Sequence, residues 1–503
     1  MNFSSQTNTE HFKKEFEEFL KEKYGTPDPE QDSQGSKSGP KSHAGSDIDF
    51  DQNPEELEAY LNHFVECQPE AVEVIATKIA THYKRMKLED TFSEEQKLVG
   101  NIKSNVLLIG PTGVGKTYIV KLIAKKIGVP FVKGDATKFS ETGYVGGDVE
   151  DLIRELVKEA DGDIKRAEYG IVYLDEVDKI ASAQNMRGVD VSRSGVQRNL
   201  LKLMEESEVD LRVPHDMASQ MEAAMEAQRT GKVDRKKINT KNILFVMSGA
   251  FSGLDDIIRK RVNQKRMGFG SDPAGDQALA KSDLFRQVTT QDLMEYGFES
   301  EFIGRLPVVA VLNELTVDAL FNILKNDDSS VTLSKKRDFQ AYGIEIQFED
   351  AALRIIAERA HQQKTGARGL VNIIENILVK YEKKLPSTKI RKFTVTEAIV
   401  TNPEQELNKL LTRQSMKEFQ QSFLETTGIV LEFEDAAINR IAQLADQHKK
   451  TFLQTAKDLF KDYEYGLKLA GRNHFSVTDS IVMDPKACLD EIIRTSYQSK
   501  QQV

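Results

Sequence analysis

The chain has 503 residues, of which 39% are hydrophobic and 29% are charged, a composition typical of a globular protein with a sizeable core. Its length is enough for about three domains. Acidic residues outnumber basic ones by 79 to 69, and the resulting net charge of −10 argues against a protein that mainly coats nucleic acid. No apolar run reaches the roughly 18 residues of a membrane helix, and two cysteines, Cys67 and Cys488, are too few for a four-cysteine zinc site. The N-terminus has no signal or transit character, so we expect a cytoplasmic protein that binds no membrane, nucleic acid or zinc.

The first 52 residues predict an amphipathic helix followed by a tether. Residues 9–24 carry large apolar side chains at helical spacing, whereas residues 26–47 have the Pro-, Gly- and Ser-rich composition of a linker. The helix either docks on an unknown partner or folds back on its own domain, and an amphipathic stripe alone does not distinguish these alternatives. The stripe comprises Phe12, Phe16, Phe19, Leu20 and Tyr24.

Short apolar runs alternate with helical patterns between residues 53 and 312. The predicted strands are 106–109, 171–174 and 243–246. Such alternation is typical of an α/β fold, in which helices cover both faces of a parallel sheet. Helical patterns dominate from about Thr316 onward.

A complete phosphate-binding loop, Gly110-Pro-Thr-Gly-Val-Gly-Lys-Thr117, follows the first strand and precedes a helical stretch. Its glycines allow backbone N–H groups to approach phosphates, and the helix N-terminus favours an anion. We expect Lys116 to contact the β- and γ-phosphates and Thr117 to bind Mg²⁺. The predicted nucleotide-binding residues of the loop are Gly110, Pro111, Thr112, Gly113, Val114, Gly115, Lys116, Thr117 and Tyr118.

The second strand ends in two acidic residues, Asp175 and Glu176. The carboxyl end of a strand is where open α/β sheets place their ligands. Asp175 is therefore predicted to hold Mg²⁺, and Glu176 to orient and polarise an attacking water. After a complete phosphate loop, this pair predicts hydrolysis of a nucleoside triphosphate.

The C-terminal part contains an internal repeat. Residues 343–352 resemble residues 428–437 at an offset of 85, and residues 393–400 resemble residues 475–482 at an offset of 82. These collinear matches predict a duplicated domain of about 85 residues.

Six further segments place these motifs in a family. Together they resemble the ClpX family of AAA+ protein unfoldases over about Tyr60 to Leu411, roughly two thirds of the chain. The segments are His82–Arg85, Asp135–Thr137, Gly143–Gly146, Gly170–Ile180, Glu301–Val309 and Lys364–Leu370.

The resemblance implies a homohexameric ring in which Arg305 completes the ATP site of the neighbouring subunit as an arginine finger. It implies that Arg368 is a sensor arginine, which couples the nucleotide to rotation about a hinge near residues 312–315. Ser248 resembles the family's sensor-1 residue, whereas Arg368 resembles sensor 2, although Ser248 could merely cap a strand end. The resemblance also implies a substrate-gripping pore loop, formed by Gly143, Tyr144, Val145 and Gly146.

The chain departs from the family in several places. We expect the family's usual N-terminal zinc domain to be absent, and Val65-Glu66-Cys67-Gln68 replaces the family's Val-Ile-Gly-Gln on the adenine side. The second copy of the repeat has lost the sensor arginine, so we expect it to contact no nucleotide. The loop that docks the peptidase ClpP in this family is represented by Met267, Gly268 and Phe269. Methionine has the flexibility and volume to replace the family's aliphatic residue, so we expect docking to survive.

We therefore predict an AAA+ large domain with a parallel sheet, a helical α+β small domain and a degenerate duplicate of that small domain. The expected function is an ATP-driven protein unfoldase that delivers substrates to ClpP and has no peptidase activity of its own. The alternatives are a remodelling chaperone that works without a protease, and an ATPase scaffold whose terminal extensions do the work. The predicted boundaries are 1–52 for the tether, then 53–312, 313–411 and 412–503 for the three domains.

Overall fold

A computed structural model of the chain describes residues 48, 51–89, 91–92, 103–140, 147–181, 191–211, 236–266, 280–328 and 330–501. Three of the predicted segments lie outside these residues. They are the N-terminal helix at 9–24, the pore loop at 143–146 and the peptidase-docking loop at 267–269.

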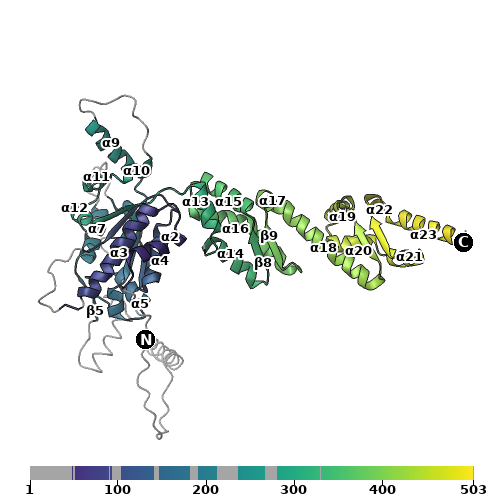
Figure 1. Cartoon of the computed structure of the whole chain (residues 1–503), viewed down its shortest axis with the longest axis horizontal. Helices are drawn as coiled ribbons and strands as arrows, with labels where there is room; N and C mark the ends of the chain where they lie inside the picture. Colours follow the sequence, from purple (N-terminus) through teal and green to yellow (C-terminus); the bar gives the residue numbers. More distant parts are fainter. Residues whose placement is uncertain are drawn as a thin grey trace, which may run out of the picture. The chain divides into compact units, whose positions relative to one another are not determined.

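The large domain, which carries the labels α2 to α5 in Figure 1, is built on a five-stranded sheet with the order β2-β3-β6-β1-β7. Every neighbouring pair in this sheet is parallel, which confirms the predicted fold class. The third predicted strand begins one residue late and runs past Met247 to Gly249. The strands are β1 (Val106–Ile109), β2 (Phe131–Asp135), β3 (Ile171–Asp175), β6 (Leu244–Gly249) and β7 (Val308–Val311).

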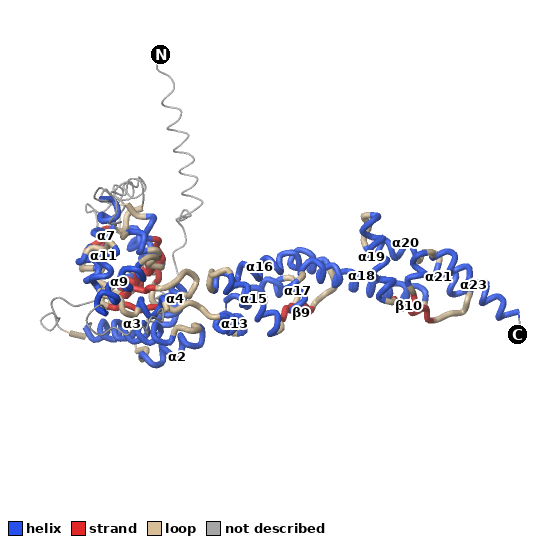
Figure 2. Tube along the Cα trace, turned by 90° about the horizontal axis from the view of Figure 1, so that it is seen from above, coloured by secondary structure: helices blue, strands red, loops and turns tan. Residues whose placement is uncertain are grey.

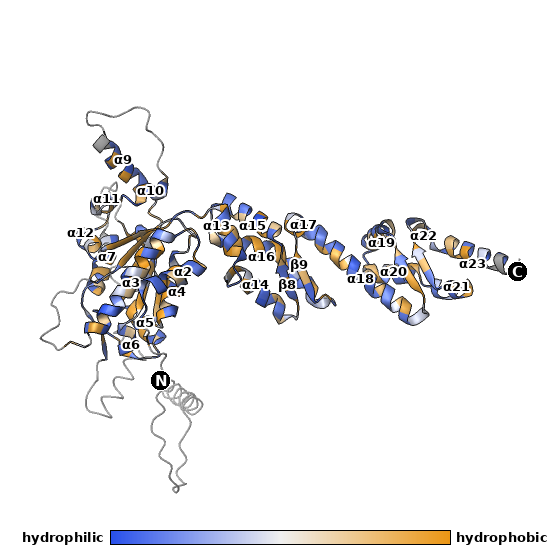
Figure 3. Ribbon diagram, in the orientation of Figure 1, coloured by the Kyte–Doolittle hydropathy of each residue, from blue (hydrophilic) through white to orange (hydrophobic). Residues whose placement is uncertain are grey.

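Alternate residues of each central strand enter two different cores. Val106 and Leu108 of β1 belong to one buried cluster, and Leu107 and Ile109 belong to the other. Both faces of the sheet are therefore covered, and its strands are coloured towards the hydrophobic end of the scale in Figure 3. The first face is covered by α2 (Pro54–Phe64), α3 (Pro69–Glu89) and α4 (Lys116–Ile127). The helices whose residues enter the second core are α5 (Asp151–Glu159), α6 (Ile164–Glu168), α7 (Val191–Met204), α9 (Leu254–Arg266), α10 (Lys281–Phe285), α11 (Thr290–Tyr296) and α12 (Ser300–Gly304).

A short two-stranded antiparallel sheet follows the end of α7 and packs into the second core. It pairs β4 (Glu208–Asp210) with β5 (Lys237–Asn239), and Val209 lies opposite Ile238. Two 3₁₀ turns, η1 (Ala136–Lys138) and η2 (Val177–Ile180), follow β2 and β3 directly.

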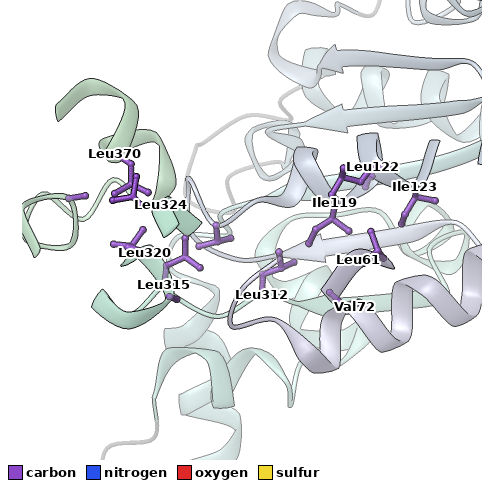
Figure 4. Packing of buried hydrophobic residues seen from close by; sticks show 14 of the residues in the cluster. Leu61, Val72, Ile119, Leu122, Ile123, Leu312, Leu315, Leu320, Leu324 and Leu370 are labelled. Carbon is purple, nitrogen blue, oxygen red and sulfur yellow. The ribbon is translucent and has the colours of Figure 1, made fainter. Parts of the chain in front are cut away.

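The small domain pairs two parallel strands, β8 and β9, against helices. Its core is continuous with the first core of the large domain, because Leu312 and Leu315 in the connection lie between Ile119 of α4 and Leu320 of α13 (Figure 4). The elements are α13 (Val317–Lys325), α14 (Ser330–Ala341), β8 (Glu345–Phe348), α15 (Asp350–Gln362), α16 (Ala367–Lys384), η3 (Leu385–Ser387), β9 (Lys392–Val395), α17 (Glu397–Thr401) and α18 (Pro403–Thr427).

The C-terminal segment repeats this arrangement in the same order. Strands β10 and β11 again form a parallel pair, and one strand of each copy, β9 and β10, is labelled in Figure 2. A detail of the side chains is also repeated, because the hydroxyls of Tyr381 and Tyr463 each donate to a proline carbonyl, of Pro403 and Pro485, at 2.8 Å. The elements are β10 (Val430–Phe433), α19 (Asp435–His448), α20 (Phe452–Leu459), α21 (Tyr463–Leu469), β11 (His474–Val477), α22 (Asp479–Met483) and α23 (Pro485–Gln501).

The two copies share helix α18, and the predicted boundary between residues 411 and 412 falls inside it. Leu407 near its start is buried in the core of the first copy, whereas Phe419 and Phe423 near its end are buried in the core of the second. The last helix of one copy is thus also the first helix of the next.

The offset between the copies falls from 85 to 82 along the chain, so the second copy is three residues shorter. This deletion lies at the start of α20. The buried residues of the two helices correspond at the offset of 82 that also relates the two tyrosines. Leu370 of α16 corresponds to Phe452 of α20, and Ile374 corresponds to Ala456. The first turn of α16, Ala367–Gly369, therefore has no counterpart in the second copy. There Thr451 begins α20 instead, with a capping box that includes the Gln454 side chain.

None of the described helices combines the length and apolar character that crossing a lipid bilayer requires.

Candidate active site

A pocket of about 480 Å³ lies where the carboxyl ends of the central strands meet α16. The parallel register brings these ends together, since Ile109 pairs with Gly249 and Leu174 pairs with Met247. Gly110, Pro111 and Ser248 do not line the pocket. The predicted site residues that line it are Thr112, Gly113, Val114, Gly115, Lys116, Thr117, Tyr118, Asp175, Glu176 and Arg368.

The phosphate loop has the backbone that its glycines predict. Gly113 and Gly115 have φ angles of 81° and 98°, in the left-handed region that favours glycine. Gly110 is constrained differently, because a Cβ there would lie 2.8 Å from the carbonyl oxygen of Leu312. Helix α4 begins at Lys116, so its free N–H groups lie at the loop and can bind an anion.

Lys116 is held by the loop itself. Its Nζ donates to the carbonyl oxygens of Gly110 and Pro111 at 2.6 and 2.8 Å. Burial lowers the pKa of Lys116 to about 8, although Asp175 and Asp178 act in the opposite direction. An anionic ligand in the pocket would favour the charged ammonium further.

Four side chains form one hydrogen-bonded chain behind the pocket, from Thr117 through Tyr173 and Ser248 to Asp175. The successive oxygen–oxygen distances are 3.0, 2.6 and 2.7 Å. The carboxylate can only accept, so Ser248 donates to Asp175; Tyr173 then donates to Ser248, and Thr117 donates to Tyr173. Ser248 is fully buried within β6, and its hydroxyl joins Tyr173 to Asp175.

Asp175 is ionised and already has a cationic neighbour. Burial raises its pKa, but hydrogen bonds from Ser248 and Lys133 outweigh this effect and hold the pKa below its ordinary value. Lys133 Nζ lies 3.2 Å from Asp175 Oδ2. The Thr117 hydroxyl and the Asp175 carboxylate are the hard oxygen donors that Mg²⁺ prefers, so the residues present fit that ion.

Glu176 has a strained backbone at the edge of the pocket. Its φ of 56° and ψ of 32° lie in the left-handed region, which costs a residue with a side chain about 1–2 kcal/mol. Its backbone N–H donates to Asp175 Oδ1 at 3.1 Å, and its side chain is exposed. Such strain is often found at functional sites.

The small domain reaches the phosphate loop through the first turn of α16. The N–H of Ala367 donates to the carbonyl oxygen of Gly113 at 2.9 Å. Gly366 has a φ of 60° and a ψ of −148°, and this conformation places Arg368 in the lining of the pocket. The Arg368 charge also contributes to lowering the pKa of Lys116.

The altered adenine-side segment is anchored to the hinge. The Gln68 side chain donates to the carbonyl of Asn313 and accepts from its N–H, at 2.9 and 2.7 Å. Cys67, at the position where the family has glycine, has a φ of 65°. Glu66 lines the pocket, so a carboxylate lies at this end of it.

Arg305 is not part of this pocket. It follows α12, its side chain is 53% exposed, and its Nη2 donates to Glu205 Oε1 at 2.6 Å. The structure thus brings together the loop, the strand-end acids, Ser248 and Arg368, but leaves Arg305 on a different surface.

Comparisons with known proteins agree with this architecture. Residues 101–309 match the AAA domain family (Cdc48 subfamily), and residues 315–387 match the C-terminal, D2-small domain of ClpB protein. The ATP-dependent Clp protease ATP-binding subunit ClpX of Treponema denticola is 38% identical over 344 residues, which cover 67% of this chain and 79% of that protein.

The chain belongs to the ClpX family. It is an AAA+ ATP hydrolase, as the sequence predicted. This family membership accounts for the order of the domains, an AAA domain followed by a small domain.

Sequence reasoning did not identify two residues that contact predicted site residues. Tyr173 lies inside an apolar strand, where a tyrosine in a buried run is the only signal of a polar function. Glu205 is separated from Arg305 by 100 residues, and no local pattern connects them.

Proposed function

We propose that this ClpX-family ATPase is a ring-forming protein unfoldase that pulls polypeptides through a central pore and delivers them to ClpP. The observation that best supports a ring is the position of Arg305. Its guanidinium is half exposed and lies outside the pocket of its own subunit. A cation in that position can act on ATP held by a neighbour, where it would stabilise the charge that develops during phosphoryl transfer.

Within one subunit, Lys116 and the N-terminus of α4 bind the phosphates of ATP. Glu176 orients the attacking water from the pocket edge, and its fixed backbone lets the exposed carboxylate point towards the ligand. Thr117 and Asp175 hold Mg²⁺, which when bound would offset the negative charge of the phosphates. Ser248 and Tyr173 hold these two ligands in register through the hydrogen-bonded chain.

Hydrolysis would be coupled to motion at the hinge. Arg368 contacts the γ-phosphate from the small domain, so loss of that phosphate removes a contact between the two domains. The hinge at residues 312–315 then allows rotation. Tyr144 in the pore loop would carry the motion to the substrate.

Delivery to a peptidase is supported by Met267-Gly268-Phe269 and by the name of the Treponema denticola relative, an ATP-binding subunit of the Clp protease. The second copy of the small domain, from α18 onward, would bind partners or brace the ring without touching nucleotide, because the turn that carries Arg368 has no counterpart there. Cytoplasmic location and the absence of zinc stay predictions.

The ring is tested by mixing two inactive variants. Glu176→Gln subunits keep Arg305, and Arg305→Ala subunits keep Glu176. Each variant alone should hydrolyse ATP poorly, and mixing them should restore part of the activity at mixed interfaces. Failure of every mixture to recover activity, with hexamers present, would argue against an arginine that acts on the neighbour.

Delivery is tested by sedimentation of the protein with its cognate ClpP in saturating ATP, with Phe269→Ala as the control. A larger species that the substitution abolishes would support a proteolytic machine. A hexamer that hydrolyses ATP but does not bind ClpP would favour a protease-independent remodelling chaperone. Tyr144→Ala should abolish substrate processing in either case, and intact processing would favour the scaffold alternative.

A further inference from the structure

The backbone of Arg305 is fixed, whereas its long side chain depends on one contact. The Arg305 carbonyl accepts from Asn105 Nδ2 at 3.0 Å, and its N–H donates to the carbonyl of Phe302 at 3.2 Å. Asn105 is itself buried and accepts from the N–H of Phe245 at 3.1 Å. The guanidinium then extends to the surface, where Glu205 binds it at 2.6 Å.

Glu205 lies on a rigid base. Lys103 Nζ donates to the carbonyl oxygens of Glu205 and Thr240, at 2.8 and 2.6 Å. Thr240 is fully buried, and its hydroxyl accepts from the N–H of Ser207 at 3.1 Å and lies 3.3 Å from the Glu205 carbonyl. These bonds tie the end of α7 to the residues that flank β4 and β5, so the backbone that carries the Glu205 carboxylate cannot swing freely.

The contact leaves most of the guanidinium available. Nη2 is bound to Glu205, whereas within the described residues no hydrogen bond is assigned to Nε or Nη1. A guanidinium presents its five N–H donors in a planar fork, so fixing one nitrogen sets the direction of the others. The geometry is that of an arginine held by one carboxylate, with about half of its side chain exposed.

The ion pair between Glu205 and Arg305 contributes little to the stability of the folded protein. Glu205 and Arg305 are 44% and 53% exposed, and ion pairs at such exposure add little to folding. An unrestrained arginine, by contrast, samples many rotamers, and ordering it at the moment of reaction is unfavourable.

We propose that Glu205 is a positioning residue for Arg305, which it holds in the direction from which the arginine reaches ATP on the neighbouring subunit. The inference rests on the proposed action of Arg305 across the subunit interface. Glu205 touches neither ATP nor the reacting atoms and acts only through the guanidinium.

The test compares Glu205→Gln with Glu208→Gln in the full-length hexamer. Glu208 is a matched control, because it lies three residues after Glu205 at the start of β4, is exposed, and forms an ion pair with Lys237 at 2.7 Å. We expect Glu205→Gln to lower kcat roughly tenfold, with unchanged binding of a fluorescent ATP analogue and unchanged hexamer sedimentation. Glu208→Gln should leave all three unchanged. An unchanged or increased kcat in Glu205→Gln would overturn the proposal.

A double-mutant cycle identifies the route of the effect. In an Arg305→Ala background, adding Glu205→Gln should cause no further loss of kcat, because no guanidinium remains to be positioned. A further loss of similar size would show that Glu205 acts elsewhere and would overturn the proposal. The Arg305→Ala variant alone separates the two ideas: if it keeps full kcat, the proposed role of Arg305 fails and the inference fails with it. If it loses activity while Glu205→Gln does not, only the inference fails.

Discussion

The carbonyl oxygen of Gly113 accepts a 2.9 Å hydrogen bond from the backbone N–H of Ala367, so the phosphate loop and the first turn of α16 are in direct contact. The approach is very close, because a Cβ on Gly113 would lie 2.2 Å from the carbonyl oxygen of Thr365. Under the proposed function, a change in the loop on nucleotide binding would reach the small domain through these backbone atoms as well as through Arg368.

Gly366→Ala should disrupt this contact. Its backbone conformation is one that side chains rarely adopt, and the added Cβ would lie 2.6 Å from the carbonyl oxygen of Gly113. With roughly 1–3 kcal/mol of strain, we expect kcat/KM for ATP to fall about tenfold or more. Gly343→Ala is the matched control, since Gly343 has a φ of 71° but open space around it. If both variants lose ATPase activity equally, strain in the small domain and not the contact is responsible.

Cys67→Gly should stabilise the protein. Cys67 has a φ of 65°, a conformation that costs a residue with a Cβ about 1–2 kcal/mol, partly offset by the greater unfolded-state entropy of glycine. We expect the free energy of unfolding in urea to rise by up to about 1 kcal/mol with an unchanged m-value. Cys67→Ala keeps the Cβ and removes only the thiol, so it should bring no such gain. Equal effects of the two substitutions would show that the thiol, not the backbone, matters.

Tyr173→Phe should weaken the response to Mg²⁺. Without the phenolic hydroxyl, Thr117 loses its acceptor and Ser248 loses its donor, at a cost of about 1–3 kcal/mol in stability. We expect the Mg²⁺ concentration for half-maximal ATPase activity to rise several-fold. Tyr83→Phe is the control, because the buried Tyr83 hydroxyl donates to the carbonyl of Tyr169 at 3.0 Å and Tyr83 does not line the pocket. A similar loss of stability with no change in the Mg²⁺ requirement is expected there; a matching shift in both variants would contradict a specific role for Tyr173.

Lys103 should make stability depend on pH. Burial lowers its pKa to about 7 from the ordinary lysine value of 10.5. Between these values the unfolded chain binds the proton that the folded protein has released, so stability should rise from pH 7 towards pH 10. Lys116, whose pKa burial lowers to about 8, acts in the same direction. Lys103→Met should destabilise the protein and reduce the slope by up to about 1.4 kcal/mol per pH unit, as measured by urea unfolding across this range. An unchanged slope would show that Lys103 stays protonated in the folded state.

The central strands and the phosphate loop could be predicted from the sequence because their signals are local. The run Val106–Ile109 is buried on both faces of the sheet, and the glycines after it provide the turn. The location of the strand-end acids could also be predicted, because parallel strands present their carboxyl ends at one edge of the sheet.

The hydrogen-bonded chain behind the pocket could not be predicted, because it depends on the register between strands. Tyr173 and Ser248 are separated by 75 residues, and only the pairing of β3 with β6 brings their hydroxyls to 2.6 Å. The exact position of the deletion in the second copy could not be predicted from the sequence either. Sequence offsets bracket it, but only the buried positions of α20 place it at the turn that in the first copy carries Arg368.

Because helix α18 belongs to both copies, the number of residues in it sets the orientation of the second copy relative to the first. It runs from Pro403 to Thr427 without an internal glycine or proline, so the copies are joined by regular helix instead of a loop. Each residue inserted between Leu411, which packs against the first core, and Met416, which packs against the second, would turn everything after it by about 100° and advance it by about 1.5 Å. Four insertions would bring the second copy back to within about 40° of its original orientation. A series of one to four added alanines would therefore change the rotational orientation of the second copy about the axis of α18 in regular steps. Any activity that depends on this orientation should rise and fall with the period of the helix.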